Sequence, residues 1–233
     1  MLAGSAHAEW EVLFDGRSTA AWRSADSAEF PASSWLVKDG LLTTIPDARF
    51  EQDLWTRNRY RDFELEFDWR ARPGGNSGVK CLVQDWIQGH KTPGRAVLGK
   101  PHEKLSAPDF EVTAGFEYQI VDEASAEATD SPTHGVGALY EYLAPMRRAA
   151  KATGSFNRSR LVVRGEHVEH LLNGKKVLEY EITGAPLAGA LAGSKRITAR
   201  LLERRPERTT PIALQHHASE VSFRSLRIRR LAP

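Results

Sequence analysis

Residues 62–71 read DFELEFDWRA, and apolar and charged side chains alternate at every position from Phe63 to Arg70. Successive side chains of an extended chain point to opposite sides, so this period of two predicts a β-strand with one buried and one solvated face. The residues expected in the core are Phe63, Leu65, Phe67 and Trp69. A strand with one apolar face needs a second layer to cover that face, which makes a layered β-protein the first expectation for the chain.

Short apolar runs separated by turn residues recur along the whole sequence. Asp39-Gly40 lies between two such runs in residues 35–44, and Asn173-Gly174 interrupts residues 159–182. Both dipeptides are typical of tight β-hairpins. Further strands are expected in residues 78–84, 115–122, 159–182 (two or three strands) and 212–231 (two strands), and one helix in residues 194–205. Many short strands with frequent turns predict an all-β sandwich.

Length and composition favour a single globular domain. The chain has 233 residues, of which 41% are hydrophobic and 27% charged, and sandwiches of this size commonly form one domain. We assign residues 10–233 to this domain, and residues 1–9 to the end of a signal peptide or a disordered N-terminus. The long stretches 85–112 and 183–211 are expected to wall a groove on one outer face.

Charge and cysteine content limit the partners and the compartment. The net charge of +2 lacks the basic excess of a nucleic-acid-binding protein, and no apolar run approaches the roughly 20 residues that span a bilayer. We therefore expect neither nucleic acid as a partner nor a membrane span. Ala-His-Ala at residues 6–8 fits the end of a secretory signal and predicts a periplasmic or secreted protein. The single cysteine, Cys81, excludes an internal disulfide, and its apolar neighbours predict a buried thiol.

No familiar catalytic motif marks a site. The sequence contains no P-loop, no dinucleotide-binding fingerprint, no His-Glu-x-x-His and no Gly-x-Ser-x-Gly. The candidates therefore come from the polar sides of strands. In residues 115–122, Glu117 and Gln119 share one face if Tyr118 and Ile120 enter the core, and Asp122 ends the strand. A solvated strand face is the alternative interpretation.

Further candidates lie in the turn PGGNSGVK, residues 73–80, and beyond it. Asn76 and Ser77 are small polar groups at the expected rim of the sandwich. Lys80 is either a solvated cation or a group that stabilises negative charge on a reacting oxygen. Tyr140, in GALYEYLAP, is a candidate acid or stacking surface, or a half-buried strand residue.

Two adjacent histidines, His216 and His217, stand in LQHHAS. Only one of them faces a groove if the segment is a strand, and His217 has the parity of Gln215. Histidine exchanges protons near neutral pH and also binds metals, so His217 is a candidate for either role or a plain surface residue. The histidines expected at the surface are His134, His167 and His170.

Seven segments occur in a specific order. They are LFDGRSTAAW, WLVKDGLLTT, LWTRNRYRDFELEFDWRARPGGNSGVK, FEYQIVD, GALYEYLAP, FNRSRLVVRGEHVEHLLNGKKVLEYE and IALQHHASEVSFRSLRIRRL. Together they resemble the 3-keto-disaccharide hydrolase family from about Trp10 to Leu231. The resemblance implies a concanavalin A-like jelly-roll sandwich with a concave sugar-binding face.

The resemblance also implies an enzyme that cleaves the glycosidic bond of 3-keto-glycosides. Removal of the C2 proton gives an enolate, the C1 substituent is eliminated, and water then adds. The implied catalytic residues are His217 or Glu117 as base, Lys80 or a divalent metal as enolate stabiliser, and Tyr140 as acid. The implied substrate-binding residues are Asn76, Ser77, Gln119, Asp122 and Asn157. A divalent metal is the only cofactor that the resemblance implies as an option, and a 3-keto-glucoside is the expected ligand.

Two other functions fit the same sandwich. A non-catalytic carbohydrate-binding module needs aromatic and amide side chains on the concave face but no base. An interaction scaffold needs no groove. The cluster of Lys80, Glu117 and His217 is the feature that favours an enzyme over both.

Overall fold

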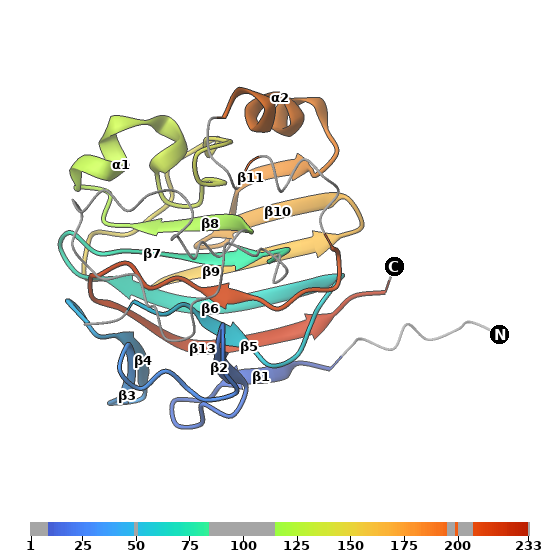
Figure 1. Ribbon diagram of the computed structural model, residues 1–233. Helices are drawn as coiled ribbons and strands as arrows, with labels where there is room; N and C mark the ends of the chain where they lie inside the picture. The colour runs from blue at the N-terminus through green and yellow to red at the C-terminus, as the bar shows by residue number, and fades with distance from the viewer. Residues whose placement is uncertain (1–8, 49–50, 84–114, 195–198, 200–206, 233) are drawn as a thin grey trace, which may run out of the picture.

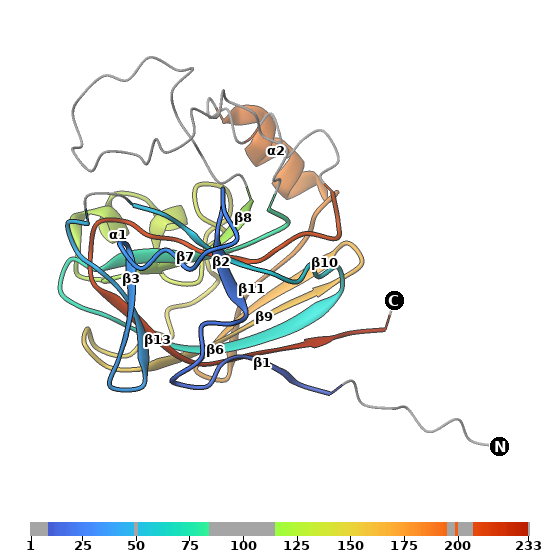
Figure 2. The ribbon, with the colours of Figure 1, turned by 60° about the horizontal axis from the view of Figure 1, so that its bottom comes forward.

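The alternating segment forms β6 (Phe63–Ala71), which lies in the larger of two sheets. The computed structural model describes residues 9–48, 51–83, 115–194, 199 and 207–232. The two sheets form two layers, with β6, β9 and β13 in one layer and β7 and β8 in the other (Figures 1 and 2). This is the β-sandwich that the strand pattern predicts, with the jelly-roll architecture that the family resemblance implies.

All strand pairs among the described residues are antiparallel. The larger sheet has the order β11 (Lys175–Glu181), β10 (His167–Leu172), β9 (Asn157–Arg164), β6, β13 (Val221–Arg230), β4 (Leu41–Thr44) and β3 (Trp35–Lys38), and β1 (Glu11–Phe14) also pairs with β13. The smaller sheet has the order β2 (Trp22–Ser24), β5 (Leu54–Thr56), β12 (Ala213–Leu214), β7 (Asn76–Cys81) and β8 (Phe116–Val121). The helical segments are α1 (Ala126–Asp130), the 3₁₀ turn η2 (Pro132–His134) and α2 (Ala185–Gly193). Among the described residues, no helix has both the length and the apolar character needed to cross a membrane.

The core lies between the sheets and contains the residues that the alternation predicts. The four apolar residues of β6 are buried, as are Tyr118 and Ile120 of β8. The rings of Phe67 and Tyr118 meet edge to face across the two layers, with centroids 5.7 Å apart. The Tyr118 hydroxyl is 2.9 Å from Ser159 Oγ, which also accepts a hydrogen bond of 2.8 Å from Trp69 Nε1. The polar groups in this part of the core are therefore paired.

Two hairpins form at the predicted dipeptides. Asp39 and Gly40 have φ angles of 53° and 74°, and Asn173 and Gly174 have φ angles of 50° and 79°. Two successive positive φ angles are the signature of the type I′ turn, whose twist matches that of the flanking strands. Residues 159–182 therefore contain parts of three strands, β9, β10 and β11.

Three local expectations need correction or fall outside the structure. The turn after β6 closes at Gly75, whose amide donates to the Arg72 carbonyl at 2.7 Å. Asn76 and Ser77 are therefore the first residues of β7, not part of the turn. The helix expected over residues 194–205 lies, apart from two residues, outside the described residues, as does the stretch 85–112; α2 ends just before it.

The expectation that His170 is a surface residue is wrong. Val168, His170 and Leu172 share the core side of β10, because alternate residues of a strand project to the same face. The His170 ring lies 4.8 Å from Tyr118, and its Nδ1 is 2.9 Å from the Gly137 carbonyl oxygen. Burial lowers the pKa of His170 to about 4, despite that hydrogen bond. It is therefore a neutral core residue near pH 7.

Candidate functional site

One row of side chains crosses the outer face of the smaller sheet. Strand pairing aligns Arg23 with Trp55, Trp55 with Ala213, Ala213 with Lys80, and Lys80 with Glu117. Directly paired residues project to the same side of a sheet. The chain neighbours of Lys80 and Glu117 within β7 and β8 are buried in the core, so this row belongs to the outer face.

Lys80 lies at the centre of an ionic cluster in this row. Its Nζ is 3.2 Å from Asp53 Oδ2 and 3.7 Å from Glu117 Oε2. The side chains of Lys80, Asp53 and Glu117 are only 8%, 13% and 11% exposed. Burial opposes the charged ammonium, but the two carboxylates outweigh this effect and raise the pKa of Lys80 above its ordinary value. The cluster therefore holds a nearly buried cation at neutral pH.

Glycine at position 78 makes room for the Glu117 carboxylate. A Cβ atom at Gly78 would lie 2.3 Å from Glu117 Oε1, so the carboxylate lies directly over the β7 backbone. Gln215 Nε2 donates to Glu117 Oε2 at 3.4 Å from the other side. Glu117 thus lies between the ammonium of Lys80 and the amide of Gln215.

A second polar cluster continues the site along β7. Glu127, on α1, accepts hydrogen bonds from Asn76 Nδ2 at 2.6 Å and from the Tyr140 hydroxyl at 3.1 Å. The ring of His134 stacks on Tyr140 with centroids 4.8 Å apart. Because Asn76 and Lys80 share a face of β7 with Gly78 between them, the two clusters flank the Glu117 carboxylate.

Unpaired polar atoms also concentrate on this face. Within the described part of the chain, the buried side-chain atoms that lack a hydrogen-bond partner are Trp55 Nε1, Asn76 Oδ1, Gln215 Oε1 and the Tyr180 hydroxyl. Three of these four belong to the outer face of the smaller sheet. In Asn76 and Gln215 a glutamate holds the NH₂ group, which leaves the amide oxygen without a donor. Because unpaired buried acceptors are costly, these two oxygens are candidates to accept hydrogen bonds from hydroxyl or amide donors.

Gln119 and His217 lie near these clusters without joining their described hydrogen bonds. Gln119 pairs with Gly78 and shares the outer face, but it is buried, and its Oε1 accepts from the Ile120 amide at 3.1 Å. His217 is exposed and electrostatically close to Glu51. Burial raises the pKa of Glu51, and the interaction with His217 opposes that effect.

The parity argument for the two histidines does not apply, because β12 ends at Leu214. His216 is buried, and its Nε2 is 3.0 Å from the Ile45 carbonyl oxygen. Its backbone amide donates to Asp53 Oδ1 at 3.0 Å and so fixes the carboxylate that faces Lys80. His216 therefore helps to position the Asp53 carboxylate, whereas His217 is exposed to solvent.

Three predicted binding residues are placed away from the row. Ser77 is fully buried, and its Oγ donates to the Gln215 carbonyl at 2.7 Å, which anchors β7 to the segment after β12. Asp122 accepts from the Gly74 amide at 2.9 Å. Asn157 Oδ1 accepts from the Lys151 amide at 2.8 Å. Asp122 and Asn157 line a small cavity beside the turn that precedes β7, where their hydrogen bonds connect loops.

The sequence patterns do not predict three members of these clusters, Asp53, Glu127 and Gln215. Asp53 shares the parity of Trp55, and two acidic residues precede this short apolar segment, which is a weak signal. Glu127 lies in an acidic, alanine-rich segment that resembles a solvated loop. Nothing in its spacing predicts contact with Asn76.

A possible metal-binding group lies on the larger sheet. His167, Glu169 and Glu179 each offer a ligand atom, and these atoms lie within 4.8 Å of one another. Lys176 Nζ, however, is 3.1 Å from Glu169 Oε1 and also bonds to Glu179. A metal there would have to displace a cation that already pairs with both carboxylates.

The fold and the site define a jelly-roll sandwich with a lysine–carboxylate cluster and oriented amides on one outer face. The chain belongs to the 3-keto-alpha-glucoside-1,2-lyase-like domain family, whose model matches residues 9–229.

Similar proteins extend over almost the whole chain. A 3-keto-disaccharide hydrolase of Bacteroides thetaiotaomicron is 27% identical over 94% of this chain and 77% of its own length. A Parabacteroides distasonis structure, provisionally named a glycosyl hydrolase, is 21% identical with a TM-score of 0.75, covering 96% of this chain and 94% of its own. A second structure from that organism, with the same provisional name, is 24% identical with a TM-score of 0.67, covering 96% and 100%. These two structures support the fold.

Proposed function

We propose that this protein cleaves the glycosidic bond of 3-keto-glycosides by elimination followed by hydration. A base removes the proton at C2, and the electrons form an enolate with its charge on the C3 oxygen. The enolate collapses, the C1–O bond breaks, and the departing oxygen takes a proton. Water then adds its oxygen to C1 and a proton to C2, which gives net hydrolysis.

The Lys80 cluster is the observation that carries this proposal. An enolate oxygen needs a preorganised positive group, and Lys80 is a nearly buried cation fixed by two carboxylates. Glu117 lies beside it over Gly78 and is the base that we favour. His217 is exposed, which favours Glu117 over His217 for this role. Tyr140, held by Glu127, is the proposed acid for the leaving oxygen.

The unpaired amide oxygens support a sugar as the ligand. Asn76 Oδ1 and Gln215 Oε1 accept no hydrogen bond, and a sugar presents several hydroxyl donors. Gln215 contacts the Glu117 carboxylate directly, and Asn76 lies two residues from Gly78, over which that carboxylate lies. The name of the curated relative, a 3-keto-disaccharide hydrolase, points to the same substrate class.

The test uses a 3-keto-glucoside with a chromogenic aglycone. We expect aglycone release and an ultraviolet-absorbing enone intermediate, and no release from the same glucoside with an unoxidised C3 hydroxyl. Glu117→Gln should lower turnover by about 10²–10⁴-fold, the usual contribution of a general base. Glu29→Gln is the matched control, because Glu29 is an exposed carboxylate that lies far from Glu117 in the sequence. Full activity of Glu117→Gln, or equal cleavage of the unoxidised glucoside, would refute the mechanism.

The alternative is a carbohydrate-binding module without catalysis, which the oriented amides alone would suit. Calorimetric binding of the 3-keto-glucoside without turnover, retained in Glu117→Gln, would establish that alternative.

We also propose that the protein acts in the periplasm or outside the cell, because the sequence pattern at residues 6–8 fits the end of a secretory signal. Cell fractionation tests this directly.

A further inference from the structure

The outer face of the larger sheet, on the other side of the sandwich, carries a concentration of arginines. The segment RSLRIRR places Arg224 and Arg227 three residues apart, so strict alternation would send them to opposite faces. A β-bulge between them, where Ser225 has a φ angle of 52°, restores the outward direction. As a result Arg224, Arg227 and Arg229 all face outward while Leu226 and Ile228 are buried.

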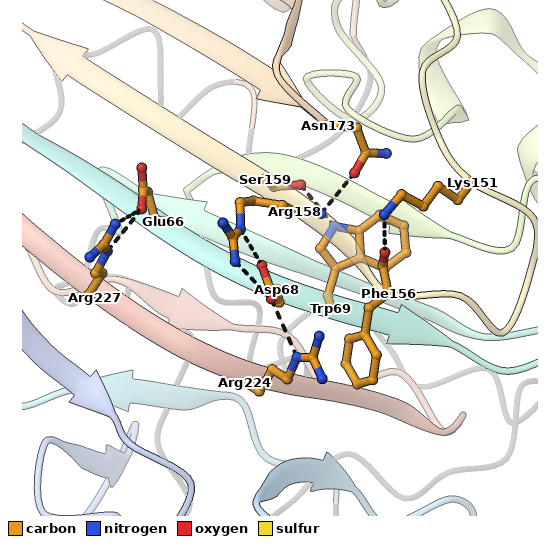
Figure 3. A network of polar contacts seen from close by, with 10 residues as sticks. All are labelled: Glu66, Asp68, Trp69, Lys151, Phe156, Arg158, Ser159, Asn173, Arg224 and Arg227. Atoms are coloured by element: carbon orange, nitrogen blue, oxygen red, sulfur yellow. Dashed lines mark hydrogen bonds and ion pairs between the residues drawn. The ribbon is translucent and has the colours of Figure 1, made fainter.

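These arginines pair with a row of carboxylates on β6. Asp68 receives Arg158 at 2.8 Å and Arg224 at 3.4 Å, so it lies between two strands' arginines (Figure 3). Glu64 in the same way receives Arg160 at 2.9 Å and Arg229.

Glu66 pairs with Arg227, as Figure 3 also shows. The charged side of β6, predicted to be solvated, is therefore covered by arginines: the side chains of Glu64 and Asp68 are only 6% and 8% exposed.

The arginines outnumber the carboxylates and remain accessible. We use "arginine face" for the three carboxylates Glu64, Glu66 and Asp68 and the six arginines Arg70, Arg158, Arg160, Arg224, Arg227 and Arg229. The side chains of Arg158, Arg224 and Arg227 are 68%, 45% and 47% exposed. The face thus keeps an excess of positive charge in contact with solvent.

Two aromatic rings, Phe156 and Trp10, contact four of these guanidinium groups. Arg224 lies 3.8 Å from the centroid of the Phe156 ring, and Arg227 lies 4.4 Å from that of Trp10. A guanidinium held by a carboxylate and a ring has lost much of its freedom before any partner binds, and an arginine has five N–H donors. Because Arg224 uses only Nε toward Asp68, its outer donors are available to an anion at small entropic cost.

We propose that the arginine face binds an anionic polysaccharide through its carboxylate or sulfate groups. Outward residues repeat about every 7 Å along a strand, so the arginines of β9 and β13 form two rows of separated charges with the carboxylates of β6 between them. Separated anionic groups on successive sugars can meet these rows. A flat sheet face does not enter the grooves of a nucleic acid duplex, which argues against a duplex as the ligand. This surface does not depend on the proposed reaction.

The experiment measures binding of dextran sulfate to the full chain, with neutral dextran, polyphosphate and anionic lipid vesicles as comparison ligands. The test variant is Arg224→Gln with Arg227→Gln. The matched control is Arg147→Gln with Arg148→Gln, which removes the same charge from an exposed loop. We expect the test variant to weaken the Kd for dextran sulfate by about twofold to thirtyfold, from roughly 0.2–1 kcal/mol per exposed charge contact. The control variant should bind as the wild type does.

Three results would overturn the proposal: no binding of dextran sulfate, equal loss in both double variants, or stronger binding of polyphosphate or vesicles through the same arginines. If the test variant fails to fold, Arg158→Gln replaces it, because the Arg158 side chain is more exposed than those of Arg224 and Arg227. Arg158→Lys, which keeps the charge, should then recover part of the binding. Glycoside cleavage should be unchanged in every variant that folds.

Discussion

Replacing Lys80 by methionine is the most informative single change to the site. Methionine keeps a long side chain but removes the cation between Asp53 and Glu117. Two nearly buried carboxylates then share a small space without a counter-charge. We expect a large loss of stability at neutral pH, in addition to the loss of any catalytic role.

The distances set the size of this loss. With an effective dielectric constant of about 20, unit charges at 3.2 Å and 3.7 Å attract by about 5 and 4.5 kcal/mol. Burial of the charges offsets part of this attraction, and removing one partner of a buried ion pair typically costs about 3–5 kcal/mol. For a domain of this size that loss lowers the Tm by about 6–20 °C.

The pH dependence gives a second, independent signature. The pKa of Lys80 is raised in the folded state, so its contribution is complete at neutral pH and is lost only as the pH rises through that raised pKa. In the variant, protonation of either carboxylate removes an unpaired buried charge. The stability difference between wild type and Lys80→Met should therefore shrink as the pH falls from neutral to about 4.

The assay is urea unfolding at a series of pH values. Lys176→Met is the matched control, since Lys176 also lies between two carboxylates, Glu169 and Glu179, but on an exposed part of the larger sheet. We expect little change in that variant, because exposed ion pairs contribute little. A Lys80→Met protein as stable as the Lys176→Met protein at neutral pH, or a deficit that stays constant on acidification, would refute the reasoning.

Three further predictions concern other buried groups. Gly78→Ala should lower the free energy of unfolding by about 1–3 kcal/mol and abolish activity, because the new Cβ would displace the Glu117 carboxylate. Gly189→Ala is the control in both urea unfolding and turnover assays, because its Cβ would meet nothing within 4 Å. Burial lowers the pKa of His170 to about 4, so as the pH falls this histidine is protonated in the unfolded state before it is protonated in the folded state. The free energy of unfolding should therefore fall by about 3 kcal/mol between neutral pH and about pH 4. In urea unfolding, His170→Phe should lack this part of the pH dependence. Burial raises the pKa of the Cys81 thiol to about 12, so a thiol reagent should label it only in unfolded protein, and rapid labelling of the native chain would contradict its placement.

Much of the fold follows from side-chain alternation and turn chemistry. The alternation in residues 62–71 predicts which side of β6 enters the core, and the two hairpin dipeptides mark turns that form as predicted. Both are local properties of the chain. The start of β7 is not set locally: the short turn closes at Gly75, and Asn76 then pairs with Val121 of β8.

The candidate site is only partly predictable for the same reason. Parity alone places Glu117 and Gln119 on one face, and the pairing of β7 with β8 then brings Lys80 opposite Glu117. Asp53 joins them only through β12, which has two residues and pairs with both β5 and β7. Such a short strand has no detectable period, so its place in the sheet is set by tertiary contacts.

The two outer faces of the sandwich differ in whether their buried polar groups have hydrogen-bond partners. This difference indicates a candidate site that no sequence motif marks. On the larger sheet, the carboxylates of Glu64 and Asp68 are each paired with two arginines, so the polar groups at the base of that face are satisfied within the protein. On the smaller sheet, the side-chain NH₂ groups of Asn76 and Gln215 each donate a hydrogen bond to a glutamate, and the buried amide oxygens have no partner. A buried acceptor without a donor costs stability, and ligand-binding sites are where proteins carry such costs. The proposal that a hydroxyl-bearing ligand binds this face, beside the lysine and the carboxylate that would act on it, therefore rests on these unpaired oxygens.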